Sequence, residues 1–268
     1  MVLLIIFALL LAAYLLALRC RRGNPQLTCL RGWSYAHRGL HGKGVPENSM
    51  EAFRLALEGG YGIELDVHLM ADGKLAVIHD ASLQRTAGAD AAIEDLTQED
   101  LSQYPLEGTD EKIPLLSDVL ALFDGKAPMI IELKAERGNH AELAQAVCRA
   151  LEDYKGVYCI ESFDPRVIRW LHKNCPEICR GQLAENFFAD REVKLKGYLK
   201  FLLGNLLVNF LTVPDFVAYR FDHRKNLGIR LARKLWGVQG VAWTIKSEED
   251  YDAAVKDGWI PIFEGFKP

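Results

Sequence analysis

Short runs with the pattern of buried strands alternate with helical patterns along most of the chain, from residue 34 to residue 263. Each run is bounded by turn residues, which is typical of strands in a layered α/β domain. Eight runs remain after one hairpin return is set aside, at residues 34–37, 63–67, 129–133, 157–161, 180–183, 216–219, 241–244 and 260–263. This alternation predicts an α/β fold with a parallel sheet closed as a (β/α)8 TIM barrel rather than an open doubly wound sheet.

One hairpin interrupts the alternation after the second strand. Asp72-Gly73 is a strong turn signal, so residues 75–79 are expected to fold back antiparallel to the strand before them. Residues 81–112 are polar and have weak periodicity. We therefore predict a small insertion after the second strand, outside the barrel.

The N-terminus contains an apolar run, Val2 to Leu18, followed by Arg19-Cys20-Arg21-Arg22. Its 17 residues would cover roughly 25 Å as a helix, the lower end of what spans a bilayer. A cleaved signal peptide and a buried helix are the alternatives, but a signal peptide usually has basic residues before its apolar run and a small-residue cleavage site after it. The favoured interpretation is a single-pass membrane protein whose catalytic domain is cytoplasmic because the basic flank stays inside.

The expected domain organisation follows from these features. Residues 1–22 are predicted to be a transmembrane anchor with its basic flank, residues 23–32 a linker, and residues 33–268 the barrel. Half of the 268 residues are hydrophobic and a quarter are charged, which suits a globular core. The net charge of −4 gives no reason to expect a nucleic-acid partner.

Polar side chains gather where predicted strands end, which is where barrel enzymes place their active sites. They are His37, Arg38, Glu64, Asp66, His79, Glu132 and Lys134. Three carboxylates in one barrel mouth repel one another, and a divalent cation relieves that repulsion. Oxygen ligands favour one hard cation, Mg²⁺ or Ca²⁺, with Mn²⁺ as a further candidate. Positive charge beside the metal suits a phosphate diester, and the two histidines can move protons near neutral pH.

Several short strings occur in a consistent order between residues 33 and 266. They are AHRG (36–39), PEN (46–48), ELDV (64–67), DGKLAVIHD (72–80), IPLL (113–116), IELK (131–134), SFD (162–164) and WT (243–244). Together they resemble the glycerophosphodiester phosphodiesterase family. The resemblance implies a TIM barrel with a small insertion after the hairpin and the hydrolysis of glycerophosphodiesters to glycerol phosphate and an alcohol.

The same resemblance implies roles for particular residues, which we carry over one by one. Glu64, Asp66 and Glu132 look like the metal ligands, His37 and His79 look like the general acid and base, and Arg38 and Lys134 look like phosphate-binding residues. Trp243 is a candidate for the substrate-binding wall, with an ordinary core position as the alternative. The family is thought to proceed through a cyclic phosphate, with the two histidines exchanging roles.

Two positions depart from the family pattern. Lys246 stands where an Asn is common, and Glu264 stands in the last strand region where an Asp is common. Both changes concern the substrate rim. The alternatives to a glycerophosphodiester substrate are a lysophospholipid, which would make the protein a lysophospholipase D acting at the membrane, and a non-catalytic barrel that binds lipid headgroups.

Residues 194–213 are unusually apolar for a barrel connection and include three lysines near their start. This pattern predicts either a helix that lies in the membrane interface and contacts membrane lipid, or a buried helix between strands. The sequence does not predict an oligomeric state.

Overall fold

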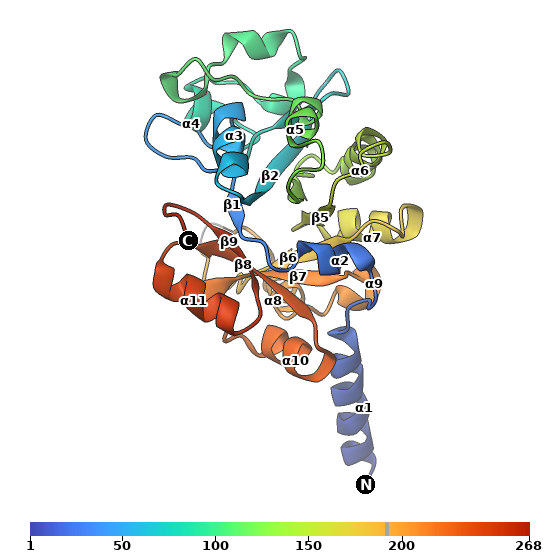
Figure 1. Cartoon of the computed structure of the whole chain (residues 1–268). Coiled ribbons are helices and arrows are strands. Elements are labelled where there is room, and N and C mark those ends of the chain that lie inside the picture. The colour runs from blue at the N-terminus through green and yellow to red at the C-terminus, as the bar shows by residue number, and fades with distance from the viewer. Residues whose placement is uncertain (191–192) are drawn as a thin grey trace.

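Eight parallel strands close into a barrel in the computed structural model, which describes residues 1–190 and 193–268 (Figure 1). The barrel strands are β1 (Tyr35–His37), β2 (Gly62–Leu69), β4 (Met129–Leu133), β5 (Tyr158–Ser162), β6 (Arg180–Ala184), β7 (Phe216–Arg220), β8 (Gln239–Ile245) and β9 (Ile260–Phe263). Closure is complete because β1 pairs in parallel with both β2 and β9. The predicted TIM barrel is therefore confirmed.

Alternation along each strand divides the side chains between the barrel interior and the helices outside. In β2, Ile63 and Leu65 pack in the core shared with the helices, so Glu64 and Asp66 face the interior. In β4, Ile131 packs on the same helix side, and Ile130 belongs to the interior core. A period of two thus places the acidic side chains of these strands inside the barrel, at the ends where the strands finish.

Amphipathic helices cover the barrel. They are α3 (Met50–Glu58), α5 (Leu116–Phe123), α6 (His140–Ala150), α7 (Pro165–Asn174), α10 (Leu227–Trp236) and α11 (Glu248–Lys256). Ser49 caps α3, because its hydroxyl accepts a hydrogen bond from the Ala52 amide at 3.1 Å. Asn48 takes a positive φ of 53° and turns its side chain toward the barrel mouth, so it is not part of the helix start.

The predicted insertion is confirmed as a small unit on the β2 side. β3 (Leu75–Val77) pairs antiparallel with β2, with Val77 opposite Val67. The following segment contains α4 (Gln84–Ala87) and three short 3-10 turns, at Ile93–Asp95, Asp100–Gln103 and Leu106–Gly108. Its side chains form a separate apolar cluster that includes Ile78, Leu83, Ile93, Leu101 and Leu106. This cluster holds the hairpin against the barrel.

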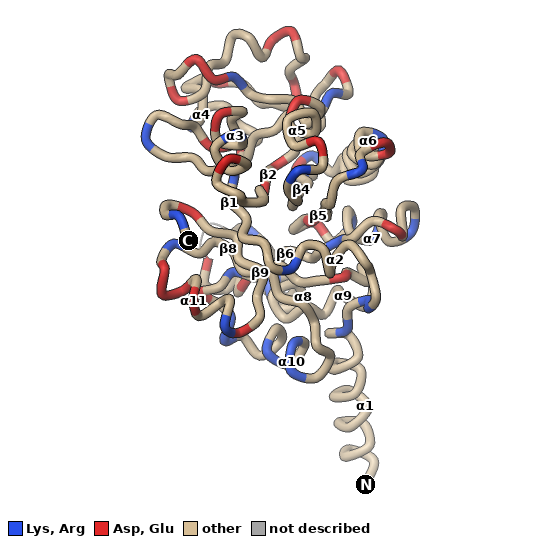
Figure 2. Tube along the Cα trace, viewed as in Figure 1, with Lys and Arg blue, Asp and Glu red and all other residues tan. Residues whose placement is uncertain are grey.

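The predicted membrane location is contradicted. The apolar N-terminal segment forms α1 (Val2–Ala17), a 16-residue helix that projects from the body and carries no charge (Figures 1 and 2). At ~1.5 Å per residue it covers only about 24 Å, whereas a membrane-spanning helix needs about 20 residues. Within residues 1–190 and 193–268, no helix is both long enough and apolar enough to cross a membrane.

Residues 25–30, in the segment predicted as a linker, form the short helix α2 (Pro25–Leu30), and Leu27 and Leu30 are buried. The apolar segment at 194–213 contains two short helices, α8 (Gly197–Gly204) and α9 (Asn209–Thr212), instead of one. Both lie in the connection between β6 and β7. The domain limits and any contact of this segment with membrane lipid stay predictions.

A cluster of two cations and one carboxylate lies at the N-terminal ends of β6 and β7. We call it the basal cluster (Arg21, Arg180 and Asp215). Arg21 donates to Asp215 from Nε at 2.6 Å and from Nη2 at 2.7 Å. The backbone amide of Arg180 donates to Asp215 Oδ2 at 2.9 Å, and Arg180 Nη2 donates to the Val213 carbonyl at 2.8 Å. Arg180 is completely buried, and these contacts compensate part of the cost of burying its charge, although its Nε has no hydrogen-bond partner among the described residues.

Candidate active site

Three buried carboxylates meet at the C-terminal end of the barrel. Glu64 and Asp66 come from β2 and Glu132 from β4, and the parallel register places Asp66 beside Glu132. One oxygen of each carboxylate lies within 4.8 Å of the others. The strand ends predicted from the sequence to carry these groups therefore do bring them together.

Two cationic side chains border the carboxylates. Lys134 Nζ lies 3.0 Å from Asp66 Oδ1 and 2.9 Å from Glu132 Oε1. Arg38 Nε lies 3.4 Å from Asp66 Oδ2, and the Arg38 amide donates to Glu64 Oε2 at 3.2 Å. Both residues that were predicted to bind phosphate are thus present at the carboxylate cluster.

Each of the two predicted histidines is held by a carboxylate at Nδ1. His37 Nδ1 lies 2.7 Å from Glu264 Oε2, and His79 Nδ1 lies 2.6 Å from Asp80 Oδ1. A carboxylate at Nδ1 fixes the ring orientation and leaves Nε2 free for proton transfer. His37 Nε2 is 3.8 Å from Glu64 Oε2, at the edge of the carboxylate cluster.

Further polar groups orient these residues, and they are not among the site residues selected from the sequence. Asn48 Nδ2 donates to Asp66 Oδ2 at 2.9 Å. Glu47 accepts from Arg38 at 2.9 Å and from Arg85 at 2.6 Å, and Arg85 also donates to Asp80 at 2.6 Å. The signal was the PEN string at 46–48, which helix capping only partly explains.

Glu264, which departs from the family pattern, is the His37 partner, and it also lies 3.4 Å from Lys246 Nζ. The two departures are therefore in contact with each other. The signal for Glu264 was its position directly after β9, the same strand-end position that identified the other candidates.

Glu161 is a fourth carboxylate of the mouth that sequence reasoning did not select. It lies on β5 beside Glu132 in the register, is only 1% exposed and lines the same cavity. Among the residues that the structure describes, its Oε2 has no hydrogen-bond partner. We call the group of four carboxylates and two cations the mouth cluster (Glu64, Asp66, Glu132, Glu161, Arg38 and Lys134).

Burial and mutual repulsion shift the pKa values in the mouth. Desolvation raises the pKa of Glu132 to about 7, and desolvation together with Asp66 and Glu132 raises the pKa of Glu64 well above its usual value. Burial also disfavours the ionised form of Asp66, but the charges of Lys134 and its other cationic neighbours outweigh this and lower its pKa. The mouth therefore has more acidic groups than its own cations can keep ionised.

The histidines are shifted in the opposite direction. Desolvation lowers the pKa of His79 to about 4 and also lowers the pKa of His37. The hydrogen bond from His37 lowers the pKa of Glu264 to about 2, so this carboxylate stays ionised. Near neutral pH both imidazoles of the ligand-free protein are neutral, with the carboxylates holding their Nδ1–H groups.

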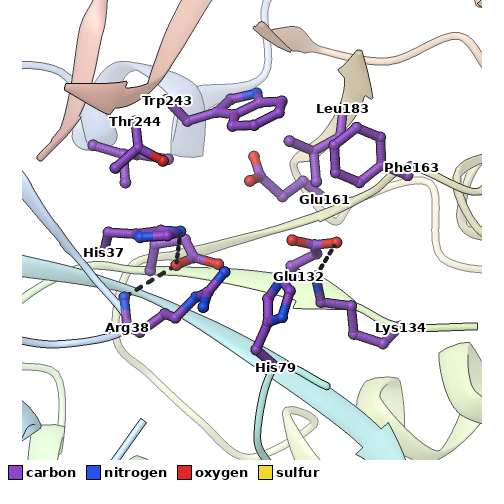
Figure 3. Close-up of a pocket in the computed structure, with 12 residues that line it drawn as sticks. His37, Arg38, His79, Glu132, Lys134, Glu161, Phe163, Leu183, Trp243 and Thr244 are labelled. Carbon is purple, nitrogen blue, oxygen red and sulfur yellow. Dashed lines mark hydrogen bonds and ion pairs between the residues drawn. The ribbon is translucent and has the colours of Figure 1, made fainter. Parts of the chain in front are cut away.

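Aromatic side chains close one side of a cavity of about 100 Å³ that these residues line (Figure 3). Trp243 and Phe163 meet edge to face with ring centroids 5.5 Å apart, and Leu183 and Thr244 complete that wall. Trp243 therefore lines the cavity and also packs against the interior core, and its role in substrate binding stays a prediction.

The donor set fits a divalent cation. Three carboxylates within 4.8 Å supply hard oxygen ligands, and the raised pKa values of Glu64 and Glu132 show that positive charge is in deficit there. A second trio, His37, His41 and Glu264, has the same spacing but is half-exposed. The carboxylate trio is the better candidate because it is buried and its acidity is uncompensated.

Comparison with known proteins identifies the family and agrees with the fold. Residues 37–263 match the Glycerophosphoryl diester phosphodiesterase family. A Glycerophosphodiester phosphodiesterase of Caldanaerobacter subterraneus is 29% identical over 83% of this chain and 89% of its own length. A lysophospholipase D of Rattus norvegicus is 35% identical over 45% of this chain and 41% of its own length. An Oleispira antarctica phosphodiesterase, solved with the product sn-glycerol-3-phosphate, shares the fold at a TM-score of 0.74 and 22% identity, over 89% of this chain and 94% of its own.

Proposed function

Because the chain belongs to the glycerophosphoryl diester phosphodiesterase family, we propose how this enzyme hydrolyses its substrate. One divalent cation, Mg²⁺, Ca²⁺ or Mn²⁺, is held by Glu64, Asp66 and Glu132, and His37 and His79 act as general acid and base. Arg38 and Lys134 bind the phosphate oxygens. The observation that carries this proposal is the gathering of three buried carboxylate oxygens within 4.8 Å, bordered by both cations.

The chain's own groups account for the steps of the reaction. One imidazole accepts the proton of the glycerol hydroxyl next to the phosphate, and that oxygen attacks phosphorus while the bond to the headgroup oxygen breaks. The other imidazole must enter this step protonated at Nε2 as well as at Nδ1, a form that the negative charge of the bound phosphate would favour, and it gives its Nε2 proton to the departing alcohol. Water then opens the cyclic phosphate with the two roles exchanged, which restores both protonation states. Glu264 and Asp80 keep both rings in place throughout. When bound, the cation supplies charge that stabilises the phosphate oxygens and lowers the pKa of a coordinated hydroxyl.

Two measurements test this proposal with glycerophosphocholine as substrate. Chelation should abolish choline release, and adding back one divalent ion should restore it. Replacement of His37 or His79 by Ala should lower turnover at least ~100-fold, the usual share of general acid–base catalysis. Full activity of the double variant His37→Ala/His79→Ala would contradict the histidine assignment. Activity that survives complete chelation would contradict the metal assignment, and a barrel that only binds headgroups would show no turnover with any ion.

A lysophospholipid is the second candidate substrate. The observation that favours it is an apolar cavity of about 650 Å³ that adjoins the catalytic residues. One relative with partial coverage is a lysophospholipase D, which agrees with this candidate.

A further inference from the structure

We propose that this apolar cavity is a binding site for one acyl chain, so that the preferred substrate is a glycerophosphodiester with an acyl group on glycerol C1 and a free hydroxyl on C2. The inference rests on the proposed function, because it places the chain next to the phosphate that the mouth would hold. We call the cavity the acyl groove and define it by the five aliphatic side chains that form its outer wall: Leu195, Leu199, Leu202, Leu203 and Val208.

The wall of the acyl groove comes from the connection between β6 and β7. Its five aliphatic side chains are half-buried, and they face the ends of β4 and β5 across the cavity. Tyr198 and Phe201, on the other side of α8, are 60% and 50% exposed. Helix α8 thus has some apolar residues facing the cavity and others facing solvent. The residues that face the cavity line an open space instead of packing in a core cluster.

The acyl groove continues from the catalytic cavity. Glu132, Lys134 and Phe163 line both spaces. Phe163 packs against Trp243 on the catalytic side, at 5.5 Å between centroids, and against Phe187 on the groove side, at 6.2 Å. If the phosphate of a ligand lies beside Lys134, the apolar part of the ligand can therefore pass along the Phe163 ring into the groove.

Size and charge also fit a single chain. The catalytic cavity, at about 100 Å³, is too small for an acyl group, whereas the groove, at about 650 Å³, is within the usual range for small-molecule sites. Of the charged residues that line the groove, Asp164 and Arg166 pair with each other at 2.6 Å, and Lys134 pairs with Glu132 at 2.9 Å. Glu136 also lines the groove, but it is exposed, so its charge can stay in water while an uncharged chain lies along the aliphatic wall.

The chemistry selects one acyl group rather than two. A 1-acyl glycerophosphodiester keeps the C2 hydroxyl that attacks phosphorus, so the headgroup leaves as an alcohol and one water is consumed overall. The product is a 1-acyl glycerol phosphate. A diacyl lipid has no such hydroxyl, and we expect it not to react.

The test compares glycerophosphocholine with 1-acyl glycerophosphocholines that carry butanoyl, hexanoyl or octanoyl chains, all below their micellar concentrations. Each methylene that enters an apolar site improves binding by up to about fourfold, so KM should fall at least ~10-fold from butanoyl to octanoyl. Turnover that is confined to the acylated substrates and rises with chain length would also support the groove.

Two variants, Leu199→Gln and Leu202→Gln, place an amide in the groove. Each should raise KM for the octanoyl substrate roughly 5- to 10-fold, as expected from lost apolar contact, while the kinetics with glycerophosphocholine stay unchanged. Leu211→Gln is the matched control, because Leu211 is 41% exposed and lies outside the groove lining. It should leave both substrates unaffected.

The outcomes separate this inference from the proposed function. Turnover of glycerophosphocholine with no dependence on chain length would overturn the acyl groove and leave the proposed function intact. An equal loss in Leu211→Gln and Leu199→Gln would assign the effect to an exposed apolar surface, such as one that meets a lipid surface, and would also overturn the groove. If the metal-loaded enzyme turns over none of these substrates, both the acyl groove and the proposed function are overturned.

Discussion

The mouth cluster and the basal cluster bury charged groups at opposite ends of the same barrel, and their balance differs. In the basal cluster a single carboxylate, Asp215, is shared by Arg21 and the Arg180 backbone, and its hydrogen bonds are short and well directed. In the mouth cluster four carboxylates face two cations, and one buried oxygen of Glu161 has no partner among the described residues.

This difference separates a structural cluster from a functional one. Buried charges stabilise a fold only when partners and hydrogen bonds compensate their desolvation. The carboxylate of the basal cluster meets that condition, because Arg21 and the Arg180 amide both donate to it, so it needs no added cation. The mouth cluster does not, and the raised pKa values of Glu64 and Glu132 are the result. The proposed cation would relieve this excess of acidic groups, and without it we expect the mouth cluster to lower the stability of the protein.

The largest predicted effect is on activity. Glu64→Gln should reduce kcat at least ~1000-fold, because a metal ligand and its charge are both lost, while the free energy of unfolding stays the same or increases. Steady-state kinetics and denaturant unfolding of the same preparation check both halves. A variant that loses stability and activity together would show that Glu64 is structural.

The next effect is on stability. Asp215→Ala should lower the free energy of unfolding by about 3–5 kcal/mol, because it leaves buried positive charge without a partner. The activity of the fraction that remains folded should be unchanged. Asp222→Ala is the matched control, since Asp222 is 71% exposed and a surface pair contributes at most about 1 kcal/mol. Similar losses in the two variants would contradict the structural role of the basal cluster.

The third prediction concerns pH and metal affinity. The pKa of Glu132 is raised to about 7, so protons compete with the cation as the pH falls through that value. The dissociation constant of the metal should increase roughly 10-fold between pH 8 and pH 6 for this one group. Calorimetry in two buffers of different ionisation enthalpy should detect the protons released on binding. Affinity that does not change with pH would place the cation elsewhere.

The smallest effect is expected for Glu161→Gln. Because burial raises the pKa of Glu161, its ionised form destabilises the folded state increasingly as the pH rises above the ordinary glutamate value. The variant should gain about 1–2 kcal/mol at pH 8 and much less at pH 5. Thermal unfolding of the metal-free protein at both pH values measures this. A loss of stability at pH 8 would show that the Glu161 carboxylate is compensated after all.

The eight-strand alternation predicted the barrel because each strand carries its own periodicity and turn signals. Selecting polar residues where predicted strands end identified His37, Glu64, Asp66, His79 and Glu132, because each strand end is visible in the local sequence. Glu161 was missed because its role depends on register, which places it beside Glu132 on the neighbouring strand and is not visible in either strand alone.

Other differences came from tertiary contacts. Asn48 has the residue type of a helix cap, but Asp66 takes its side chain and Ser49 caps the helix. The contact between Asn48 and Asp66 leaves no periodic signal in the sequence. The apolar run at the N-terminus predicted a membrane span, but its helix has 16 residues and ends at Ala17, two positions before Arg19, so it is shorter than the about 20 residues that a span needs.

The residues that precede His79 pack on two sides: Leu75 and Val77 belong to the main core, and Ala76 and Ile78 belong to the apolar cluster of the insertion. The position of His79 therefore depends on the packing of the insertion, whereas His37 lies on the barrel strand β1. Local unfolding of the insertion would displace His79 and abolish activity while the barrel stays folded. Enzymatic activity would therefore report how stably the insertion packs.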